Sequence, residues 1–220
     1  MKILGIDASG PTLAVGLVLD QMVAADFMWI RPRTAGSHLV PWIEQIVNEF
    51  GRPDAIACGI GPGSFTGVRI AVTAAKALAY AWNIPVKGVS SLQAWAMQIP
   101  LGHRALITTE LRGSAFYAGY YQAARPQPTP LMPDMAVNGS LPDAFPSDTA
   151  LYVVGPLSET SAGLGMAGPL ARPLTIALLG SSVALLARTA LIEGYSDTAE
   201  TLAPFYGRPP AITVATPGTE

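Results

Sequence analysis

Apolar and polar positions follow two different periods in the first fifty residues, and each period predicts a different kind of element. The near-continuous apolar run from Lys2 to Ala8 indicates a buried strand. Two further apolar-rich runs, residues 12–19 and 22–29, lie on either side of Asp20-Gln21, so we expect a tight β-hairpin there. Residues 37–50 instead space their apolar side chains as one face of a helix does, which predicts an amphipathic helix.

The next fifty residues continue this alternation between short apolar runs and helical spacing. Residues 54–60 indicate a buried strand, and a glycine-dense turn, residues 61–69, joins it to an alanine-rich helix that ends near Trp82. A short strand over residues 84–89 precedes a helix that Ser90-Ser91 caps. The resulting order βββαβαβα is typical of a ribonuclease-H-like half, the building block of the actin, hexokinase and Hsp70 group.

The remaining chain predicts a second set of similar elements. Strands over residues 105–109 and 115–121 lie on either side of a turn at Arg112-Gly113. Residues 151–154 indicate another strand, and residues 181–193 indicate a helix that Gly194 ends. We therefore expect an α/β fold of the actin-like ATPase or ribonuclease-H-like type, built from two similar mixed-sheet halves.

The length of the chain suits one large domain or two small ones. We place an N-terminal ribonuclease-H-like half at residues 1–103 and assign dimerisation to it. The C-terminal half occupies residues 104–220 and includes a proline-rich irregular insert at residues 125–149. Residues 209–220 are predicted to form a frayed tail.

Composition narrows the classes of function. Half of the residues are hydrophobic and 13% are charged, which is a low charged fraction for a soluble domain. We expect apolar surface to be covered in an oligomer, because exposed apolar patches usually mark contacts. The net charge is −2, and lysine and arginine form no run. Since nucleic-acid affinity depends on neutralising phosphates, the chain by itself is predicted to bind nucleic acid poorly.

The single cysteine and the most apolar late segment both have structural interpretations. Cys58 lies in an apolar strand, so we interpret it as a core residue that forms no intramolecular disulfide. Residues 174–191 are interrupted by Gly180 and Arg188, among others, which favours a buried helix over a membrane span. We find no signal peptide before the first strand and expect a cytoplasmic protein without membrane contact.

The glycine turn Gly61-Pro62-Gly63-Ser64-Phe65-Thr66-Gly67 has two interpretations. Ser64 and Thr66 can cap the following helix, and a helix N-terminus favours anions. The turn has neither the G-x-x-x-x-G-K-[ST] nor the G-x-G-x-x-G spacing, however, so its nucleotide signal is weak. The alternative is a tight turn packed against a neighbouring segment.

As a complete string, GPGSFTGVRI closely resembles the signature of the bacterial TsaB (YeaZ) family. Other segments are similar to family elements in the same order, from residue 1 to about residue 208. Ala35 stands where the family usually has His, and Glu110-Leu111 replace the usual Asp-Ala, so the roles of those family residues are not transferred to this chain. The further matching strings are MKILGIDAS (Met1–Ser9), RTAGSHLVPWI (Arg33–Ile43), ELRGSAFY (Glu110–Tyr117) and PFYGR (Pro204–Arg208).

The resemblance implies an accessory role in forming N6-threonylcarbamoyladenosine (t6A) at position 37 of tRNA. It implies a non-catalytic scaffold that binds and activates TsaD, the subunit that transfers the threonylcarbamoyl group, together with the small ATPase TsaE. It further implies a homodimer when the chain is alone, contact with tRNA only through the complex, and no intrinsic cofactor, with an adenine nucleotide expected at most at the partner interface. The family was once grouped with glycoproteases, but the residues of this chain do not support peptidase activity.

Four polar residues are weak candidates for cofactor binding. In actin-like ATPases an Asp at the end of the first strand helps to hold metal and phosphate, which makes Asp7 and its neighbour Ser9 candidates. The alternative is that both side chains satisfy turn amides. Arg69 and Arg112 lie within the matching strings and could bind an anion or link two loops.

Catalytic groups are sparse. The two histidines, His38 and His103, are far apart in sequence and no other ligands gather near them, so we predict no metal site and no catalytic residue. Ser64 lies in no G-x-S-x-G motif and is interpreted as a helix cap. The competing hypothesis is a small actin-fold ATP-dependent phosphotransferase, with an adenosine loop at Gly155-Pro156 or Gly163–Gly168.

The helix after the glycine turn is apolar over more of its surface than one sheet would cover. Its polar positions form a single narrow stripe, and its alanines let another helix approach closely. The helix is either enclosed within its own half or part of a subunit interface, as the resemblance implies. We assign to the interface Thr66, Val68, Arg69, Ile70, Thr73, Ala74, Ala77 and Leu78.

Overall fold

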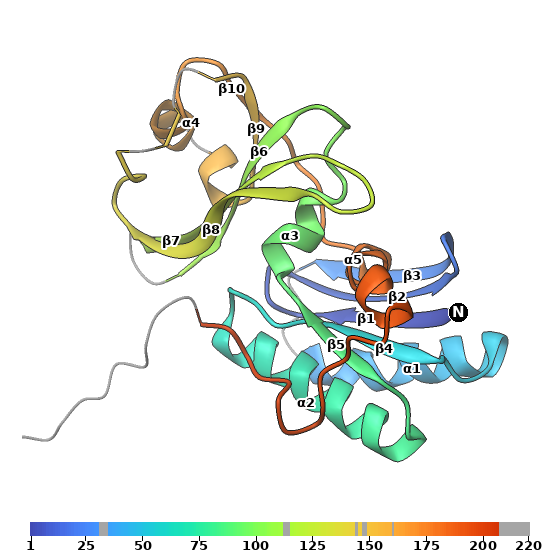
Figure 1. Cartoon of the computed structure of the whole chain (residues 1–220). Coiled ribbons are helices and arrows are strands. Elements are labelled where there is room, and N and C mark those ends of the chain that lie inside the picture. The colour runs from blue at the N-terminus through green and yellow to red at the C-terminus, as the bar shows by residue number, and fades with distance from the viewer. Residues whose placement is uncertain (31–34, 112–114, 144, 147–148, 160, 207–220) are drawn as a thin grey trace, which may run out of the picture.

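Two five-stranded mixed sheets and the helices around them make up the computed structural model of the chain (Figure 1). The predicted turn at Arg112-Gly113 and the predicted tail at residues 209–220 lie outside the residues that the structure describes. The described residues are 1–30, 35–111, 115–143, 145–146, 149–159 and 161–206.

The first sheet has its most apolar strand in the middle. Strand β1 pairs antiparallel with β2 and parallel with β4. Ile3, Leu4 and Ile6 of β1 are fully buried, as expected for a strand that helices cover on both faces. The predicted hairpin at Asp20-Gln21 is confirmed, because β2 and β3 are joined there. In spatial order the strands are β3 (Met22–Ile30), β2 (Thr12–Leu19), β1 (Lys2–Asp7), β4 (Ala55–Gly59) and β5 (Val86–Val89).

The second sheet repeats the strand order of the first. In each sheet the third, second, first, fourth and fifth strands of the half lie side by side, with the first three antiparallel and the others parallel. The predicted α/β fold with two similar mixed-sheet halves, of the ribonuclease-H-like and actin-like type, is therefore confirmed. In spatial order the strands are β10 (Ala171–Pro173), β9 (Leu151–Val154), β6 (Arg104–Glu110), β7 (Ala115–Gln122) and β8 (Thr129–Asn138).

The helices connect the two halves more closely than the sheets do. In Figure 1, α1 (Ala35–Phe50) and α2 (Phe65–Trp82) lie on one face of the first sheet, and α5 (Gly180–Ile192) lies on the other. Helix α3 (Ser91–Ala96) follows the first sheet in sequence but contacts β6 and β7 of the second. Each half thus contributes its last helix to the sheet of the other half. The short 3-10 helix η1 (Pro156–Glu159) and α4 (Ser161–Ala167) lie beside β9 and β10.

The backbone of helix α5 packs directly against the backbone of the first sheet. A Cβ atom added to Gly180 would lie 2.1 Å from the amide nitrogen of Gly16, and one added to Gly5 would lie 2.0 Å from the carbonyl oxygen of Gly180. The carboxylate of Asp26 on β3 accepts a hydrogen bond from the amide of Ser181 at 2.9 Å. It supplies the helix N-terminus with the anionic cap that Leu179 cannot give.

A partly buried polar network also joins the halves. The hydroxyl of Ser90, which precedes α3, donates to Asp134 on β8 at 2.5 Å and accepts from the amide of Gln93 at 3.0 Å. The hydroxyl of Tyr121 on β7 donates to the same carboxylate. Burial raises the pKa of the Asp134 carboxyl, and burial together with that carboxylate raises the pKa of Tyr121. The second sheet therefore holds the start of α3, which follows the first sheet in sequence, in place.

The prediction of an irregular insert at residues 125–149 was wrong over residues 129–138, which form strand β8. Strand β8 is the edge of its sheet, where a proline costs little because one side of the strand needs no partner. This explains how the sheet accommodates Pro130 and Pro133. The boundary between the halves at residue 103 stays a prediction. Within the described part of the chain, every helix is too short or too polar to cross a membrane.

Candidate functional site

The glycine turn between β4 and α2 is packed against the loop that joins β1 to β2. Gly61, Pro62 and Gly63 are buried. A Cβ atom on Gly63 would lie 2.1 Å from the carbonyl oxygen of Ser9, and the amide of Ser64 donates to that same oxygen at 2.6 Å. A Cβ atom on Gly67 would lie 1.8 Å from the carbonyl oxygen of Ala8 in this loop. These glycines allow two backbones to touch, which favours the packed-turn interpretation over an open anion site.

Ser64 begins helix α2 in the predicted way. Its hydroxyl accepts a hydrogen bond from the amide of Gly67 at 3.3 Å, so it acts as the N-cap. Phe65 and Thr66 are exposed at the first turn of the helix.

The last described residues of the chain complete this region. The amide of Phe205 donates to the carbonyl oxygen of Ile60 at 2.7 Å, directly before the turn. The ring of Tyr206 lies 5.2 Å from that of Phe65. The backbone carbonyl oxygen of Tyr206 accepts a hydrogen bond from the hydroxyl of Tyr117 at 2.9 Å. Four of the strings that carry the family resemblance therefore meet at the start of α2, although they are far apart in sequence.

Arg69 holds this arrangement from the surface. Its Nε atom donates to the Tyr206 hydroxyl at 3.0 Å, and its guanidinium carbon lies 3.8 Å from the centre of the Phe65 ring. These contacts match the second interpretation of Arg69, a link between two loops. Arg112, the other arginine considered, lies outside the described residues.

Asp7 is fully buried and its two carboxylate oxygens are occupied by the protein. One oxygen accepts from the amide and hydroxyl of Ser9 at 2.7 and 2.8 Å, and the other accepts from the hydroxyl of Ser91 at 2.5 Å. Ser91 in turn accepts from the amide of Gly61 at 3.0 Å. Burial raises the pKa of Asp7. Its carboxylate therefore connects β1, the glycine turn and α3.

These contacts do not fit a magnesium-bound nucleotide at Asp7. A metal ligand needs an oxygen that faces the cation, and both oxygens here face protein donors. A Cβ atom on Gly59 would lie 1.7 Å from the Asp7 carboxylate, so the space beside it is filled. Ser91 was not predicted to be a partner of Asp7, because its place in the sequence indicates only a helix-capping serine. The arrangement disfavours the phosphotransferase hypothesis, which required Asp7.

Cys58 and the histidines have ordinary environments. Cys58 is fully buried in the core between the first sheet and α2, where burial raises the pKa of its thiol well above the ordinary value. This confirms it as a core residue. His103 is exposed, and its ring contacts that of Tyr152. His38 on α1 is half-buried, with its ring 3.8 Å from that of Trp29 on β3.

Helix α2 presents half of the predicted interface residues to solvent. Thr66, Arg69, Thr73 and Ala77 are exposed. The assignment of Val68 to this face was wrong, because its side chain is fully buried in the core beneath the helix. The error came from reading the interface as a stretch of sequence rather than as one side of a helix. The half-buried members of the predicted set are Ile70, Ala74 and Leu78.

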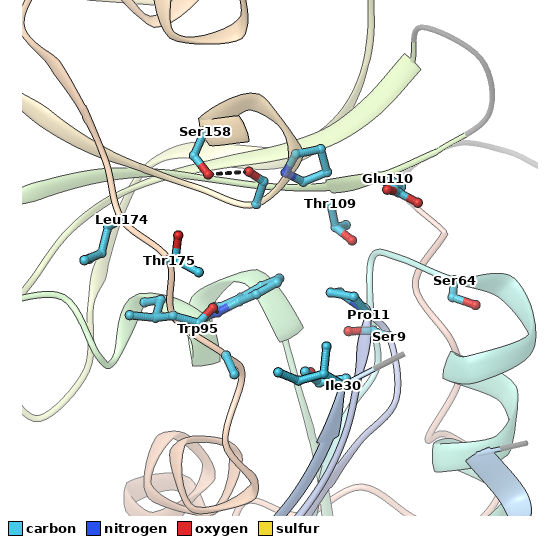
Figure 2. Close-up of a pocket in the computed structure, with 16 residues that line it drawn as sticks. Ser9, Pro11, Ile30, Ser64, Trp95, Thr109, Glu110, Ser158, Leu174 and Thr175 are labelled. Carbon is cyan, nitrogen blue, oxygen red and sulfur yellow. Dashed lines mark hydrogen bonds between the residues drawn. The ribbon is translucent and has the colours of Figure 1, made fainter. Parts of the chain in front are cut away.

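A cavity of about 730 Å³ lies between the two halves (Figure 2). Ser9 and Pro11 come from the β1–β2 loop and Trp95 from α3, while Thr109 and Glu110 end strand β6 on the opposite wall. Gly155-Pro156, one of the two loops considered for adenosine binding, lines the cavity. Gly163–Gly168, the other loop, lies in and just after α4 and does not line it.

Comparisons with known proteins find sequence similarity to TsaD and TsaB proteins. The family model of TsaD, a tRNA N6-adenosine threonylcarbamoyltransferase, matches residues 30–122. The TsaB protein of Bacillus subtilis is 36% identical over 100 residues, which cover 44% of this chain and 44% of that protein. The TsaB protein of Escherichia coli is 38% identical over 100 residues, covering 44% of this chain and 43% of that protein. The sequence matches thus span less than half the length of these relatives.

Solved structures extend the likeness over nearly the whole chain. A Pseudomonas aeruginosa protein described as similar to peptidase YeaZ superposes with a TM-score of 0.78 at 25% identity, covering 94% of this chain and 99% of that one. Together these matches support membership of this chain in the TsaB/YeaZ family. A second P. aeruginosa structure, YeaZ itself, has the same fold with a TM-score of 0.77 at 24% identity, covering 93% of this chain and 99% of that one.

Proposed function

We propose that this TsaB/YeaZ-type chain is an accessory subunit for t6A formation in tRNA, and that it binds a TsaD protein through the outer surface of α1 and α2. The observation that carries this proposal is the exposed face of α2. Thr73 and Ala77 are small and face solvent in the middle of an 18-residue helix, where another helix could pack at close range. Phe65 and Tyr80, which are 54% and 84% exposed, lie at the two ends of this face.

The segment that matches the TsaD family contains this same surface. Residues 30–122 include α1 and α2, so a TsaD partner has a similar stretch of sequence to offer. Exposed charges on the two helices differ in sign: α1 carries Glu44 and Glu49, whereas α2 carries Arg69. Two such helix pairs related by a two-fold axis would place unlike charges opposite one another. This supports docking on TsaD, and a homodimer when the chain is alone.

The chemistry of the transfer belongs to the partner in this proposal. Asp7 and Cys58 are buried and Ser64 is a helix cap, so these three side chains have structural roles. We further propose that TsaE joins this assembly, that tRNA is held mainly by the partners, and that any adenine nucleotide lies at the junction with TsaD.

The test is to change the centre of the α2 face. Ala77→Arg places a long charged side chain where a partner helix would pack, so we expect binding to TsaD of the same organism to weaken by on the order of 100-fold, close to 3 kcal/mol. The t6A yield of the mixture should fall with it. Isothermal titration calorimetry measures the binding, and a tRNA modification assay measures the product.

Ala162→Arg in α4 is the matched control, since Ala162 is also an exposed helical alanine but lies in the other half. It should leave both readouts unchanged. Equal binding of wild type and Ala77→Arg would reject the α2 face, and ATP turnover by the purified chain alone would reject the accessory role.

A further inference from the structure

Strand β3 carries the largest group of exposed apolar side chains in the described part of the chain. Six of its nine residues are exposed. Of the fourteen large hydrophobic side chains that are exposed among the described residues, five lie on β3 and two on α2. The five on β3 are Met22, Val23, Met28, Trp29 and Ile30. Because such groups of exposed apolar side chains usually mark contacts, β3 indicates a contact surface that is separate from the α2 face.

Strand β3 is also an open edge of the first sheet (Figure 1). In the described part of the chain, β2 is its only strand partner, so the backbone groups on its outer side pair with no strand. Proteins usually protect such an edge with prolines, lysines, a short strand or a covering segment. Strand β3 is nine residues long and contains no proline, lysine or arginine.

The other three sheet edges are protected in these ways. Strand β8, the equivalent third strand of the second half, contains Pro130 and Pro133. Strand β10 has three residues and ends in Pro173. Strand β5 is covered by the segment after α5, since the amide of Asp197 donates to the carbonyl oxygen of Val86 at 2.7 Å. Among the four described edges, β3 therefore stands out as the one left suited to pairing with another strand.

Helices flank β3 on both faces of the sheet. On one face, the rings of Phe27 and Trp29 lie 5.7 Å from that of Trp42 and 3.8 Å from that of His38 on α1. On the other face, Asp26 bonds to the start of α5. A nine-residue strand is roughly 30 Å long, and a sheet with a helix on each face is roughly 25 Å thick. This edge thus measures on the order of 700 Å², close to the roughly 800 Å² per partner of a stable interface.

The charges of this edge suit a second copy of itself. Asp26 is the one charged residue of β3, and its carboxylate is turned inward. It accepts from the amide of Ser181 at 2.9 Å, and a Cβ atom on Gly16 would lie 2.3 Å from it. Antiparallel pairing with Phe27 on a two-fold axis would set Asp26 opposite Met28 of the second copy. No like charges of β3 then face each other, which would oppose pairing.

We propose that two copies of this chain pair antiparallel through β3 and join their first sheets into one continuous sheet. The contact would bury the exposed apolar side chains of β3 and pair its outer backbone groups. It uses no residue of the α2 face, so it leaves that face free for TsaD. Failure to bind TsaD would leave this proposal intact.

Sedimentation equilibrium of the purified Ala77→Arg chain tests the proposal, because this variant blocks association through α2. We expect it to be a dimer at about 50 μM. Adding Met28→Lys places a charge on the edge of both copies, so the dissociation constant should rise on the order of 100-fold. Leu131→Lys in the same background is the matched control, since Leu131 lies on the equivalent edge strand β8 and is 42% exposed, against 41% for Met28. It should remain a dimer.

Hydrogen exchange gives a second measurement, which does not require the Met28→Lys variant to fold. In the Ala77→Arg chain, amides of residues 22–30 should exchange roughly tenfold more slowly at about 50 μM than at about 0.5 μM. Amides of residues 129–138 should exchange alike at both concentrations. A monomer at about 50 μM would overturn the second copy as the occupant and point to a strand of another protein. A dimer that survives Met28→Lys, or one that Leu131→Lys weakens equally, would also overturn the proposal.

Discussion

The two halves have the same strand order but their sheets are covered differently. Helices α1 and α2 cover one face of the first sheet, and α5 covers the other. The second sheet has only short helices against it in the described part of the chain, namely α3, η1 and α4. The two halves therefore share one strand order, and they differ in the helices that cover their sheets. The first half carries a long exposed helix surface, and the second half completes the core of the first.

The largest effect should come from breaking the contact between α5 and the first sheet. Gly180→Val places side-chain atoms where the backbone of β2 already lies, 2.1 Å from the amide nitrogen of Gly16. We expect loss of more than about 4 kcal/mol of folding free energy, or no folded protein at all. Urea denaturation followed by circular dichroism measures this change.

Gly165→Ala serves as the comparison, because a Cβ atom at Gly165 in α4 would meet nothing within 4 Å. It should be neutral or stabilise by up to about 1 kcal/mol. If Gly180→Val were tolerated, or if it unfolded the second sheet while the first stayed intact, the interdependence of the halves would be refuted.

A smaller loss of folding free energy should distinguish the two helix-capping serines, Ser90 and Ser64. Ser90 caps α3 and also donates to Asp134 in the second sheet, whereas Ser64 caps α2 within its own half. Ser90→Ala should cost about 2 kcal/mol, since a helix cap is lost and a partly buried carboxylate loses a donor. Ser64→Ala should cost about 1 kcal/mol or less. Equal losses in urea denaturation would mean that the bond between the halves contributes nothing.

The smallest effect is a pH dependence from Asp134. Its folded pKa is raised by burial above the ordinary value of 3.8, so the folded state holds the proton more tightly than the unfolded state. The stability that this adds is complete below pH 3.8 and is lost as the pH rises through the folded pKa. Relative to Asp134→Asn, the wild type should therefore gain stability on acidification. Parallel curves for the two proteins from pH 3 to pH 7 would contradict this.

Local sequence patterns predicted most elements because each depends on neighbouring residues. The hairpin after β2 and the cap at Ser64 required only a few adjacent side chains. Strand β8 was missed because its prolines argue against a strand, and only its position at a sheet edge makes them acceptable. That position is a property of the assembled sheet.

The candidate site was harder to predict because it joins residues from distant segments. Asp7 was considered as a weak cofactor-binding candidate, but its partner Ser91 lies on another element, so the sequence could not show that both of its carboxylate oxygens have protein donors. Val68 was misplaced because the phase of a helix against its sheet is fixed by packing.

The position of α5 has a consequence for the synthesis of this protein on the ribosome. The strands of the first sheet end at Val89, but the helix that covers one face of it ends only at Ile192. At ordinary translation speeds, the nascent chain must wait roughly 5–20 s before that helix has even been made. During this interval an apolar sheet surface stays open to water and to other chains, which is the kind of surface that holding chaperones recognise.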